Sequence, residues 1–483
     1  LLGHGHFAFG ETAKESYDQI IVHTQKVADY LKIENPTNLF TRNPHRASGV
    51  FPIIRGLIGD MIGPNSPMPI MDLRNGKDEL QFLKRNDLEE LSTRGTASPD
   101  HVIRIKGRPL ILRESVWSQG REAIKEELDK YAEEYKAMFE RQAPQADQPK
   151  TMLPSDPKNI WMEGIGLIGL GANAKAASIA GDLVVQNARV RAIGEDAGGF
   201  RPISEKDLFD CEYWSLEQAK LGKGAPPKFQ GKVVMITGGS GTIGFAIAKA
   251  FSKLGAQTIL VDKDEIALKE SVTKLGVGHK YFPIDVTHSD AANQALLAAI
   301  NNFGGLDILI SNAGAAHAGP MLDISNEEFR NAFELNFFSH YSFSTEAAKI
   351  LKDQNRGGQI LFNISKQAVN PGKNFGAYGL PKATTFFLMR QLALELGSDG
   401  IRVNGINADR IRSGLLTDEF ISSRAKSRGV SESEYMAGNL LNKEVTAEHV
   451  ADAFTALACA ESTTGHVMTC LLYTSDAADD SLG

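Results

Sequence analysis

The chain has 483 residues, which is too long for one ordinary hydrophobic core, so two or three domains are expected. Hydrophobic residues make up 42% and charged residues 23%, as in ordinary soluble proteins, and no run approaches the ~20 apolar residues of a membrane helix. The net charge of −7 gives no reason to expect nucleic acid or an anionic membrane as a partner, and three cysteines, too few for a disulfide framework, fit a reducing, cytoplasmic compartment.

The first half of the chain has the mixed pattern of an α/β domain. Residues 11–32 have the spaced apolar positions of an amphipathic helix, and residues 60–70 are rich in Pro, Gly, Met and Asn and are expected to be loop. A strongly charged helix is expected over 118–141, before a polar, Pro-rich connector. A strand then begins at Ile160 and leads into the loop GIGLIGLGANAK and an Ala-rich helix. This loop imitates a dinucleotide-binding turn, but no acidic residue ends a suitable strand, so no second cofactor site is expected.

A regular alternation of strands and helices begins at Gly231, after the linker GKGAPPKFQ, and continues to Thr469. It predicts a doubly wound, Rossmann-type parallel sheet with helices on both faces. The first strand runs directly into TGGSGTIG and a helix beginning near Phe245. Such glycines allow a tight turn against a pyrophosphate, and the helix N-terminus offers free N–H groups. The residues of this turn expected to bind the cofactor are Thr237, Gly238, Gly241, Thr242, Ile243 and Gly244.

Polar residues follow the later strands of this half. Asp262 ends the second strand, where a carboxylate accepts the ribose hydroxyls of a dinucleotide and repels a 2′-phosphate. NAD is therefore expected rather than NADP. Asp285 and Val286 follow the third strand, and Asn312, Ala313 and Gly314 follow the fourth.

Tyr378 and Lys382 are four residues apart on a predicted helix, so they share one face of it. A nearby ammonium lowers a phenol pKa that would otherwise be about 10. Tyr378 would then be a usable general acid and base near neutral pH. The pair comes 13 residues after Ser365, which follows a strand, and downstream of the dinucleotide pattern.

On these motifs, residues 229–469 resemble the short-chain dehydrogenase/reductase family. The resemblance implies that Ser365 orients the substrate oxygen, that Tyr378 moves the proton, and that Lys382 lowers the tyrosine pKa and holds the nicotinamide ribose. It also implies that Asn336 anchors a water in the proton relay. The resemblance further implies that Asp285 and Val286 meet the adenine and that Asn312, with Ala313 and Gly314, lines the cofactor groove.

The chain departs from the family after the sixth strand, where Ala408-Asp409 replaces the usual Pro-Gly. Ser413 stands where the family often has a threonine that bonds the nicotinamide carboxamide. Arg410 and Arg412 are candidates to bind a substrate phosphate or carboxylate; alternatively, they are solvated or ion-paired loop residues.

The N-terminal segment HGHFAFGETAKESY resembles the part of class II sugar-phosphate aldolases that carries one zinc-binding histidine. The match makes His4 that ligand and His6 a second candidate. A zinc site needs about three protein ligands, and the family's His-x-His pair and catalytic carboxylate lie upstream of this segment. Zinc is therefore expected in an intact aldolase module and no aldolase activity in this chain, which we expect to be a fragment.

The stretches STRGTASPDHVIRIKGRPL and LFDCEYWSLEQAKL resemble the joining region of bifunctional aldolase/short-chain dehydrogenase proteins. The segment CLLYTSDAADD resembles a translated sequencing adapter. The expected domains are a partial aldolase-like domain at 1–110, an α/β joining region at 111–222, the dehydrogenase at 229–469 and an adapter-derived tail at 470–483.

The expected function is nicotinamide-dependent oxidation or reduction of a hydroxyl or carbonyl group. Its small-molecule substrate would be a sugar-derived aldehyde, a sugar or a sugar phosphate, and a homo-oligomer is expected. Two alternatives stay open: a stand-alone sugar dehydrogenase whose N-terminal half is a scaffold, and a cofactor-binding module without turnover. The complete Ser365, Tyr378 and Lys382 set argues against the last.

Overall fold

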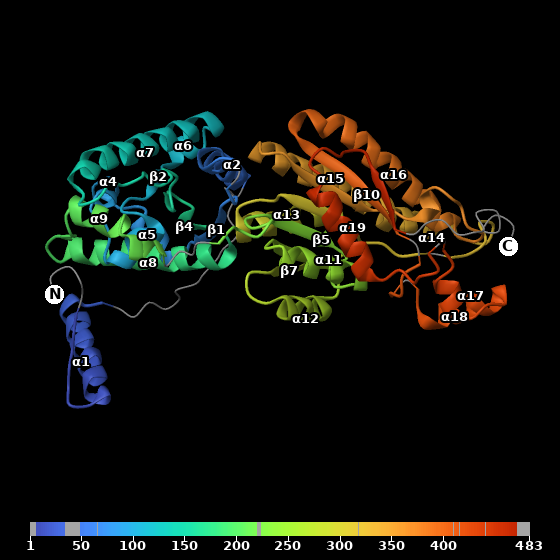
Figure 1. Cartoon of the computed structure of the whole chain (residues 1–483), viewed down its shortest axis with the longest axis horizontal. Coiled ribbons are helices and arrows are strands. Elements are labelled where there is room, and N and C mark those ends of the chain that lie inside the picture. Colours follow the sequence, from blue (N-terminus) through green and yellow to red (C-terminus); the bar gives the residue numbers. More distant parts are fainter. Residues whose placement is uncertain are drawn as a thin grey trace. The chain divides into compact units, whose positions relative to one another are not determined.

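The computed structural model describes residues 6–33, 49–64, 66–219, 224–316, 318–408, 410–414, 416–439 and 441–470. The chain divides into two compact units, Leu1–Pro226 and Pro227–Gly483 (Figure 1). Of the expected adapter-derived tail, only Cys470 belongs to the described residues, where it ends the last strand.

The first unit is built around a four-stranded mixed sheet with the strand order β1-β4-β3-β2. Strand β4 pairs antiparallel with both β1 and β3, whereas β2 and β3 are parallel. Its strands are β1 (Ile70–Arg74), β2 (Leu110–Leu112), β3 (Asn159–Met162) and β4 (Gly166–Gly171). Its helices are α1 (Ala13–Leu31), α2 (Phe51–Ile62), α3 (Lys77–Phe82), α4 (Leu88–Ser92), α5 (Pro99–Ile105), α6 (Glu114–Trp117), α7 (Arg121–Gln142), α8 (Ala174–Asp196), α9 (Glu205–Glu212) and α10 (Ser215–Ala219).

The helices expected over 11–32 and 118–141 are confirmed as α1 and α7. The expected domain division at residue 110 falls inside the sheet, because β1 pairs with β4 on the other side of that division. Strands from both segments therefore share one hydrogen-bonded ladder.

The expected loop GIGLIGLGANAK is wrong, because Gly166–Gly171 forms strand β4 in the interior of the sheet. The glycines serve packing between this strand and helix α8. A Cβ on Gly169 would lie 2.2 Å from the backbone nitrogen of Gly181, and one on Gly171 would lie 2.2 Å from that of Ala177. The helix then begins after Asn173, whose side chain accepts a hydrogen bond from Ala176 N at 2.9 Å. The glycine pattern thus reflects close helix–strand contact.

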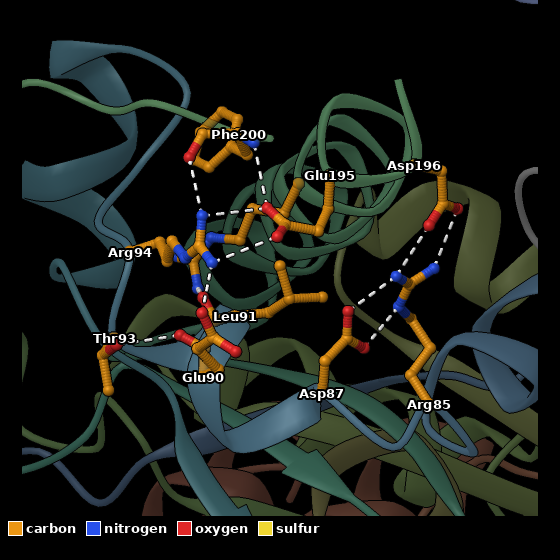
Figure 2. Close-up of polar contacts among 10 residues, drawn as sticks. Arg85, Asp87, Glu90, Leu91, Thr93, Arg94, Glu195, Asp196 and Phe200 are labelled. Carbon is orange, nitrogen blue, oxygen red and sulfur yellow. Dashed lines mark hydrogen bonds and ion pairs between the residues drawn. The ribbon is translucent and has the colours of Figure 1, made fainter. Parts of the chain in front are cut away.

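Arginine–carboxylate contacts tie the end of α8 to the segment around α4 (Figure 2). Arg85 donates two hydrogen bonds to Asp87, both at 2.8 Å, and two to Asp196, at 2.8 and 2.9 Å. Arg94 is paired with Glu195 at 2.9 Å and also donates to the Phe200 carbonyl at 3.2 Å. Bidentate arginine–carboxylate contacts of this kind fix the relative orientation of the two side chains as well as their distance.

The second unit contains a seven-stranded sheet in the order β11-β10-β9-β8-β5-β6-β7, in which all the paired neighbours are parallel. Its strands are β5 (Val233–Thr237), β6 (Gln257–Asp262), β7 (Lys280–Pro283), β8 (Ile308–Ser311), β9 (Gly358–Asn363), β10 (Ile401–Ala408) and β11 (Val467–Cys470). Its α-helices are α11 (Thr242–Lys253), α12 (Glu265–Leu275), α13 (Ala291–Phe303), α14 (Asn326–Phe333), α15 (Ser339–Gln354), α16 (Gly376–Leu396), α17 (Asp418–Arg428), α18 (Glu432–Met436) and α19 (Ala447–Cys459).

This arrangement confirms the predicted doubly wound fold. Side chains of β5 and β8 form one core with helices α11 and α19, including the fully buried Ile236, Phe251, Ile310 and Phe454. Because β5 lies between β6 and β8, the chain leaves β5 in one direction across the sheet and later continues in the other. Ligands of such sheets bind at the carboxyl ends of the strands, at this switch point.

Candidate active site

A cavity of about 1070 Å³ is lined by loops that follow β5, β6, β7, β8, β9 and β10. Most of the residues expected to bind the cofactor line it: Gly238, Gly241, Thr242, Ile243, Gly244, Asp262, Asp285, Val286, Asn312, Ala313, Gly314 and Ser413. The expected catalytic residues Ser365, Tyr378 and Lys382 line the same cavity. Three expected site residues, Thr237, Asn336 and Arg412, are not among its lining residues.

The turn after β5 is shaped by glycines that leave no room for side chains. Gly238 has a φ of +64°, and a Cβ on Gly244 would lie 2.1 Å from the Gly238 carbonyl oxygen. Helix α11 begins directly after Gly241, and no side chain caps its first N–H groups. A turn that brings backbone this close to a helix N-terminus fits a dinucleotide pyrophosphate.

Thr237 supports this turn from inside the protein. Its hydroxyl is buried and accepts hydrogen bonds from the backbone nitrogens of Asn312 at 2.9 Å and Ala313 at 3.1 Å. Asn312 in turn donates to the Thr237 carbonyl at 3.0 Å and accepts from Asn363 Nδ2 at 2.8 Å. Thr237 is thus a positioning residue that connects the ends of β5 and β8, and Asn312 extends the connection to β9.

Two carboxylates enter the cavity from the ends of β6 and β7. Asp262 accepts backbone hydrogen bonds from Lys263 at 2.8 Å and from Ser240 at 3.3 Å, so it lies against the glycine turn. Asp285 accepts from the backbone nitrogen of Thr287 at 3.0 Å, and this bond is the main cause that lowers the pKa of Asp285. Both carboxylates therefore line the cavity on the β6 and β7 side of the glycine turn.

Ser365 and Tyr378 meet at the end of β9. Tyr378 lies on α16 and is half-buried; its desolvation raises its pKa, and a hydrogen bond with the Ser365 side chain lowers it in part. Burial also lowers the pKa of Lys382 to about 7. The Lys382 Nζ lies 5.9 Å from the Tyr378 ring centroid and donates to the Asn363 carbonyl at 3.0 Å. The expected lowering of the tyrosine pKa by Lys382 is therefore not found: burial disfavours the charged form of each group, and Lys382 is not among the causes that shift the pKa of Tyr378.

Asn336 lies behind the cavity, fully buried in a π-helical turn (Glu334–Phe338) between α14 and α15. Its side chain donates to the Ala315 carbonyl at 3.0 Å and accepts from the Ala315 nitrogen at 3.3 Å. A Cβ on Gly314 would lie 2.9 Å from Asn336 Oδ1 and 3.4 Å from Lys382 Nζ. The Asn-Ala-Gly segment therefore fits closely against both predicted relay residues.

Comparisons with known proteins agree with this geometry. Residues 232–421 match the family model described as short chain dehydrogenase, and residues 45–221 match the one described as aldolase class II, second domain. Secoisolariciresinol dehydrogenase of Forsythia intermedia is 31% identical over 244 residues, which cover 49% of this chain and 85% of that protein. The chain belongs to the short-chain dehydrogenase family.

The similarity also extends across both halves of the chain. The uncharacterized oxidoreductase YuxG of Bacillus subtilis is 29% identical over 496 residues, covering 96% of this chain and 71% of that protein. A solved 3-ketoacyl-(acyl-carrier-protein) reductase from Brucella melitensis, complexed with NADH, is 25% identical with a TM-score of 0.46 and covers 50% of this chain and 96% of its own. The expected fusion of an aldolase-type domain with a short-chain dehydrogenase, whose family binds a nicotinamide cofactor, is confirmed.

His340 of the dehydrogenase was not expected at the site. It is buried on α15, its Nε2 lies 3.4 Å from Lys382 Nζ, and its Nδ1 lies 2.6 Å from Ser311 Oγ. Burial first, and then the charge of Lys382, hold the pKa of His340 well below its usual range. The neutral imidazole therefore connects the end of β8 to the catalytic lysine. A single histidine on a helical pattern carries no signal of such a contact in the sequence.

The arginines of the dehydrogenase differ from the expectation in one respect. Arg410 lines the cavity, but Arg412 does not. Arg412 donates to Glu444 at 2.8 Å and to Asp418 at 2.9 Å, and these ion pairs hold its side chain away from the cavity. Arg424 and Arg428, both on α17, line the cavity instead. Arg424 and Arg428 lie outside the sequence motifs, so the motifs did not identify them.

The loop that departs from the dehydrogenase family contributes Ala408 and Ser413 to the cavity, and Asp409 lies outside the described residues. Ser413 donates its hydroxyl hydrogen bond to the Ile411 carbonyl at 3.1 Å. Ser413 lines the cavity, and its contact with the nicotinamide stays a prediction.

The expected zinc ligand, His4, lies outside the described residues. His6 lies 3.0 Å from His23, nitrogen to nitrogen. Within the part of the chain that the structure describes, no group of three or more His, Cys, Asp or Glu side chains is arranged to hold a metal ion. In that same part, no helix is long and apolar enough to cross a membrane.

Proposed function

We propose that this chain is an NAD-linked dehydrogenase that interconverts a hydroxyl and a carbonyl group on a sugar-derived aldehyde, a sugar or a sugar phosphate. The observation that carries the proposal is that Ser365, Tyr378 and Lys382 line the same cavity as the glycine turn and Asp262. Proton-transfer groups and a dinucleotide-binding turn thus face one space.

Side chains of this protein donate and accept the proton that is transferred in the proposed reaction. In the reducing direction, the Tyr378 hydroxyl gives its proton to the carbonyl oxygen of the substrate, and the Ser365 hydroxyl donates a hydrogen bond to the same oxygen. The raised pKa of Tyr378 keeps the phenol protonated at neutral pH. In the oxidising direction the same groups work in reverse. The nicotinamide, when bound, supplies or accepts the hydride.

Binding of the cofactor is proposed for the residues of the turn and the strand ends. The N–H groups at the start of α11 would meet the pyrophosphate, because no side chain caps them. Asp262 would accept hydrogen bonds from the adenosine ribose, and its charge favours NAD over NADP. Lys382 would hold the nicotinamide ribose.

A substrate screen with the full chain tests the proposal. Sugars, sugar phosphates and hydroxyaldehydes are offered with NAD or NADP, and their carbonyl counterparts with the reduced cofactors, while the absorbance of the reduced cofactor is followed. We expect turnover of at least one compound, faster with NAD than with NADP. Tight cofactor binding without turnover of any compound would instead favour a cofactor-binding module.

A further inference from the structure

The arginines and the carboxylates that line the cavity follow strands on opposite sides of β5, and the lysines Lys263, Lys366, Lys373 and Lys382 line it as well. Within the described chain, the carboxylates that line it are Asp262 and Asp285, which end or follow β6 and β7. The arginines that line it are Arg410, two residues after β10, and Arg424 and Arg428 on α17. Strands β6 and β7 lie on one side of β5, whereas β9 and β10 lie on the other, with Ser365 following β9. The arginines therefore lie on the side of the catalytic residues, whereas Lys263 places a positive charge beside Asp262.

Arg410 is the most buried of these arginines, with 8% of its surface exposed. Its guanidinium lies 4.6 Å from the ring centroid of Tyr435, and its Nη1 donates to the Tyr435 carbonyl. Among the described residues no carboxylate forms an ion pair with it, and its other donors have no protein acceptor. A buried cation without an anionic partner is costly, and a guanidinium fork matches a carboxylate or a phosphate.

Arg424 provides a second guanidinium that lacks an anionic partner in the described chain. Arg424 lines the cavity, and its Nε is buried without a hydrogen-bond acceptor. The guanidinium lies 6.0 Å from the ring centroid of Phe375, which immediately precedes helix α16 and is three residues before Tyr378. This arginine is therefore next to the catalytic helix.

Arg412 offers the contrast within the same loop. Its two carboxylate partners, Asp418 and Glu444, satisfy its charge, and it lies outside the cavity lining. The chain thus pairs the arginine that faces away from the site and leaves two arginines at the site without carboxylates. This difference points to a ligand that brings its own negative charge.

We propose that Arg410 and Arg424 form an anion site that binds a carboxylate or phosphate carried by the substrate. This inference rests on the proposed function and narrows its substrate class to an anionic hydroxy or carbonyl compound. The anionic group lies against α17 and the loop after β10, while the reacting carbon lies at Ser365 and Tyr378. The two ends of the substrate are thereby fixed separately, which sets the carbon that reacts.

Matched substrates and variants test the anion site. The ratio of kcat/KM for a phosphorylated or carboxylated compound to that of its neutral counterpart is measured for the full chain and for Arg410→Met and Arg424→Met. Each substitution is expected to lower this ratio by about 10- to 100-fold, as for the loss of a hydrogen bond to a charged group. Whether the phosphorylated or the carboxylated compound has the larger ratio identifies the anion.

The variant Arg412→Met is the matched control, because it removes an arginine from the same loop that does not line the cavity. It is expected to leave the ratio within about threefold, since an exposed ion pair contributes little. Because Arg410 is buried and could be needed for folding, Arg424→Gln and Arg410→Lys are measured as well. An equal ratio in all variants, or a preference of the unaltered chain for neutral compounds, overturns the proposal.

A second readout does not depend on turnover. Titration with inorganic phosphate or with malonate, without cofactor, is expected to raise the melting temperature of the unaltered chain and of Arg412→Met. For Arg410→Met and Arg424→Met, the same rise in melting temperature should require at least about tenfold more of the anion. Anion binding that survives both substitutions lies elsewhere, at the glycine turn for example, and contradicts the site. Absence of turnover with every compound contradicts the proposed function, whereas the titration still decides the anion site.

Discussion

Lys382 Nζ lies 3.4 Å from Nε2 of His340, and both side chains are buried. With its proton on Nδ1, facing Ser311 Oγ at 2.6 Å, the imidazole accepts a hydrogen bond from the lysine at Nε2. This acceptor favours the charged form of a lysine whose pKa burial lowers to about 7. His340 is therefore a positioning residue that acts through Lys382.

Replacement of His340 by leucine removes that acceptor. We expect kcat for carbonyl reduction to fall by about 10- to 100-fold, the effect of one hydrogen bond to a charged group. The basic limb of its pH profile should also move to lower pH, because Lys382 loses its proton more easily. The variant His340→Gln keeps an acceptor and should recover part of the rate. An unshifted pH profile in His340→Leu would assign the histidine a packing role only.

Burial of Lys382 makes stability depend on pH in a defined direction. Its pKa in the folded chain is about 7 against an ordinary value of 10.5, so between these values the unfolded chain binds the extra proton. The folded chain is most stable above pH 10.5, where Lys382 is neutral in both the folded and the unfolded chain. This stability is lost as the pH falls towards 7, because only the unfolded chain then gains the proton. Relative to Lys382→Met, the free energy of unfolding should rise with pH by up to ~1.4 kcal/mol per unit in this window. Denaturant melts at several pH values measure this difference, and a constant difference would contradict it.

Asp262 should set the choice of cofactor. Its carboxylate lies against the glycine turn through the Ser240 nitrogen, where the 2′-phosphate of NADP would bring a like charge. We expect NAD to bind more tightly than NADP, and Asp262→Ser to change the ratio of the two dissociation constants at least tenfold towards NADP. Fluorescence titration with both reduced cofactors gives the ratio. Tighter binding of NADP to the unaltered chain would refute this role, and the neighbouring Lys263 would then be the residue to replace.

Gly244 should tolerate no side chain. A methyl group there would lie 2.1 Å from the Gly238 carbonyl oxygen, so Gly244→Ala must displace the turn or the start of α11. Overpacking of this kind typically costs ~1–3 kcal/mol, and cofactor affinity should fall with it. Gly397→Ala is the control, because its Cβ would meet no atom within 4 Å and its φ is −61°. Equal melting temperatures and cofactor affinities for the two variants would mean that the turn adapts.

The sequence predicts the strand-end residues well because the strands are apolar runs that stop at polar residues. Asp262, at the end of β6, lies where this pattern puts it, and the fixed period of a helix brings Tyr378 and Lys382 to one face. By contrast, the choice between Arg412 and Arg424 depends on ion pairs made by loop residues, which no local pattern records.

Two further differences arise from packing. The glycine-rich stretch that forms β4 was expected to be a loop, because it has no apolar periodicity. The glycines are in fact required because helix α8 packs too closely against β4 for side chains. The pKa of Tyr378 is raised by burial and not lowered by Lys382 as expected, and the depth of a side chain is a property of the assembled fold. A pKa shift therefore cannot be assigned from a pair of charged residues in the sequence until the burial of both groups is known.

The most direct test of the proposed chemistry is the turnover of Tyr378→Phe. The ring stays in place and only the hydroxyl is lost, so NADH should bind within a few-fold of the unaltered chain. Because proton transfer by a positioned group contributes typically ~10²–10⁴-fold, kcat should fall by at least about 100-fold. Turnover within a few-fold of the unaltered chain, with cofactor affinity retained, would contradict Tyr378 as the proton donor and acceptor.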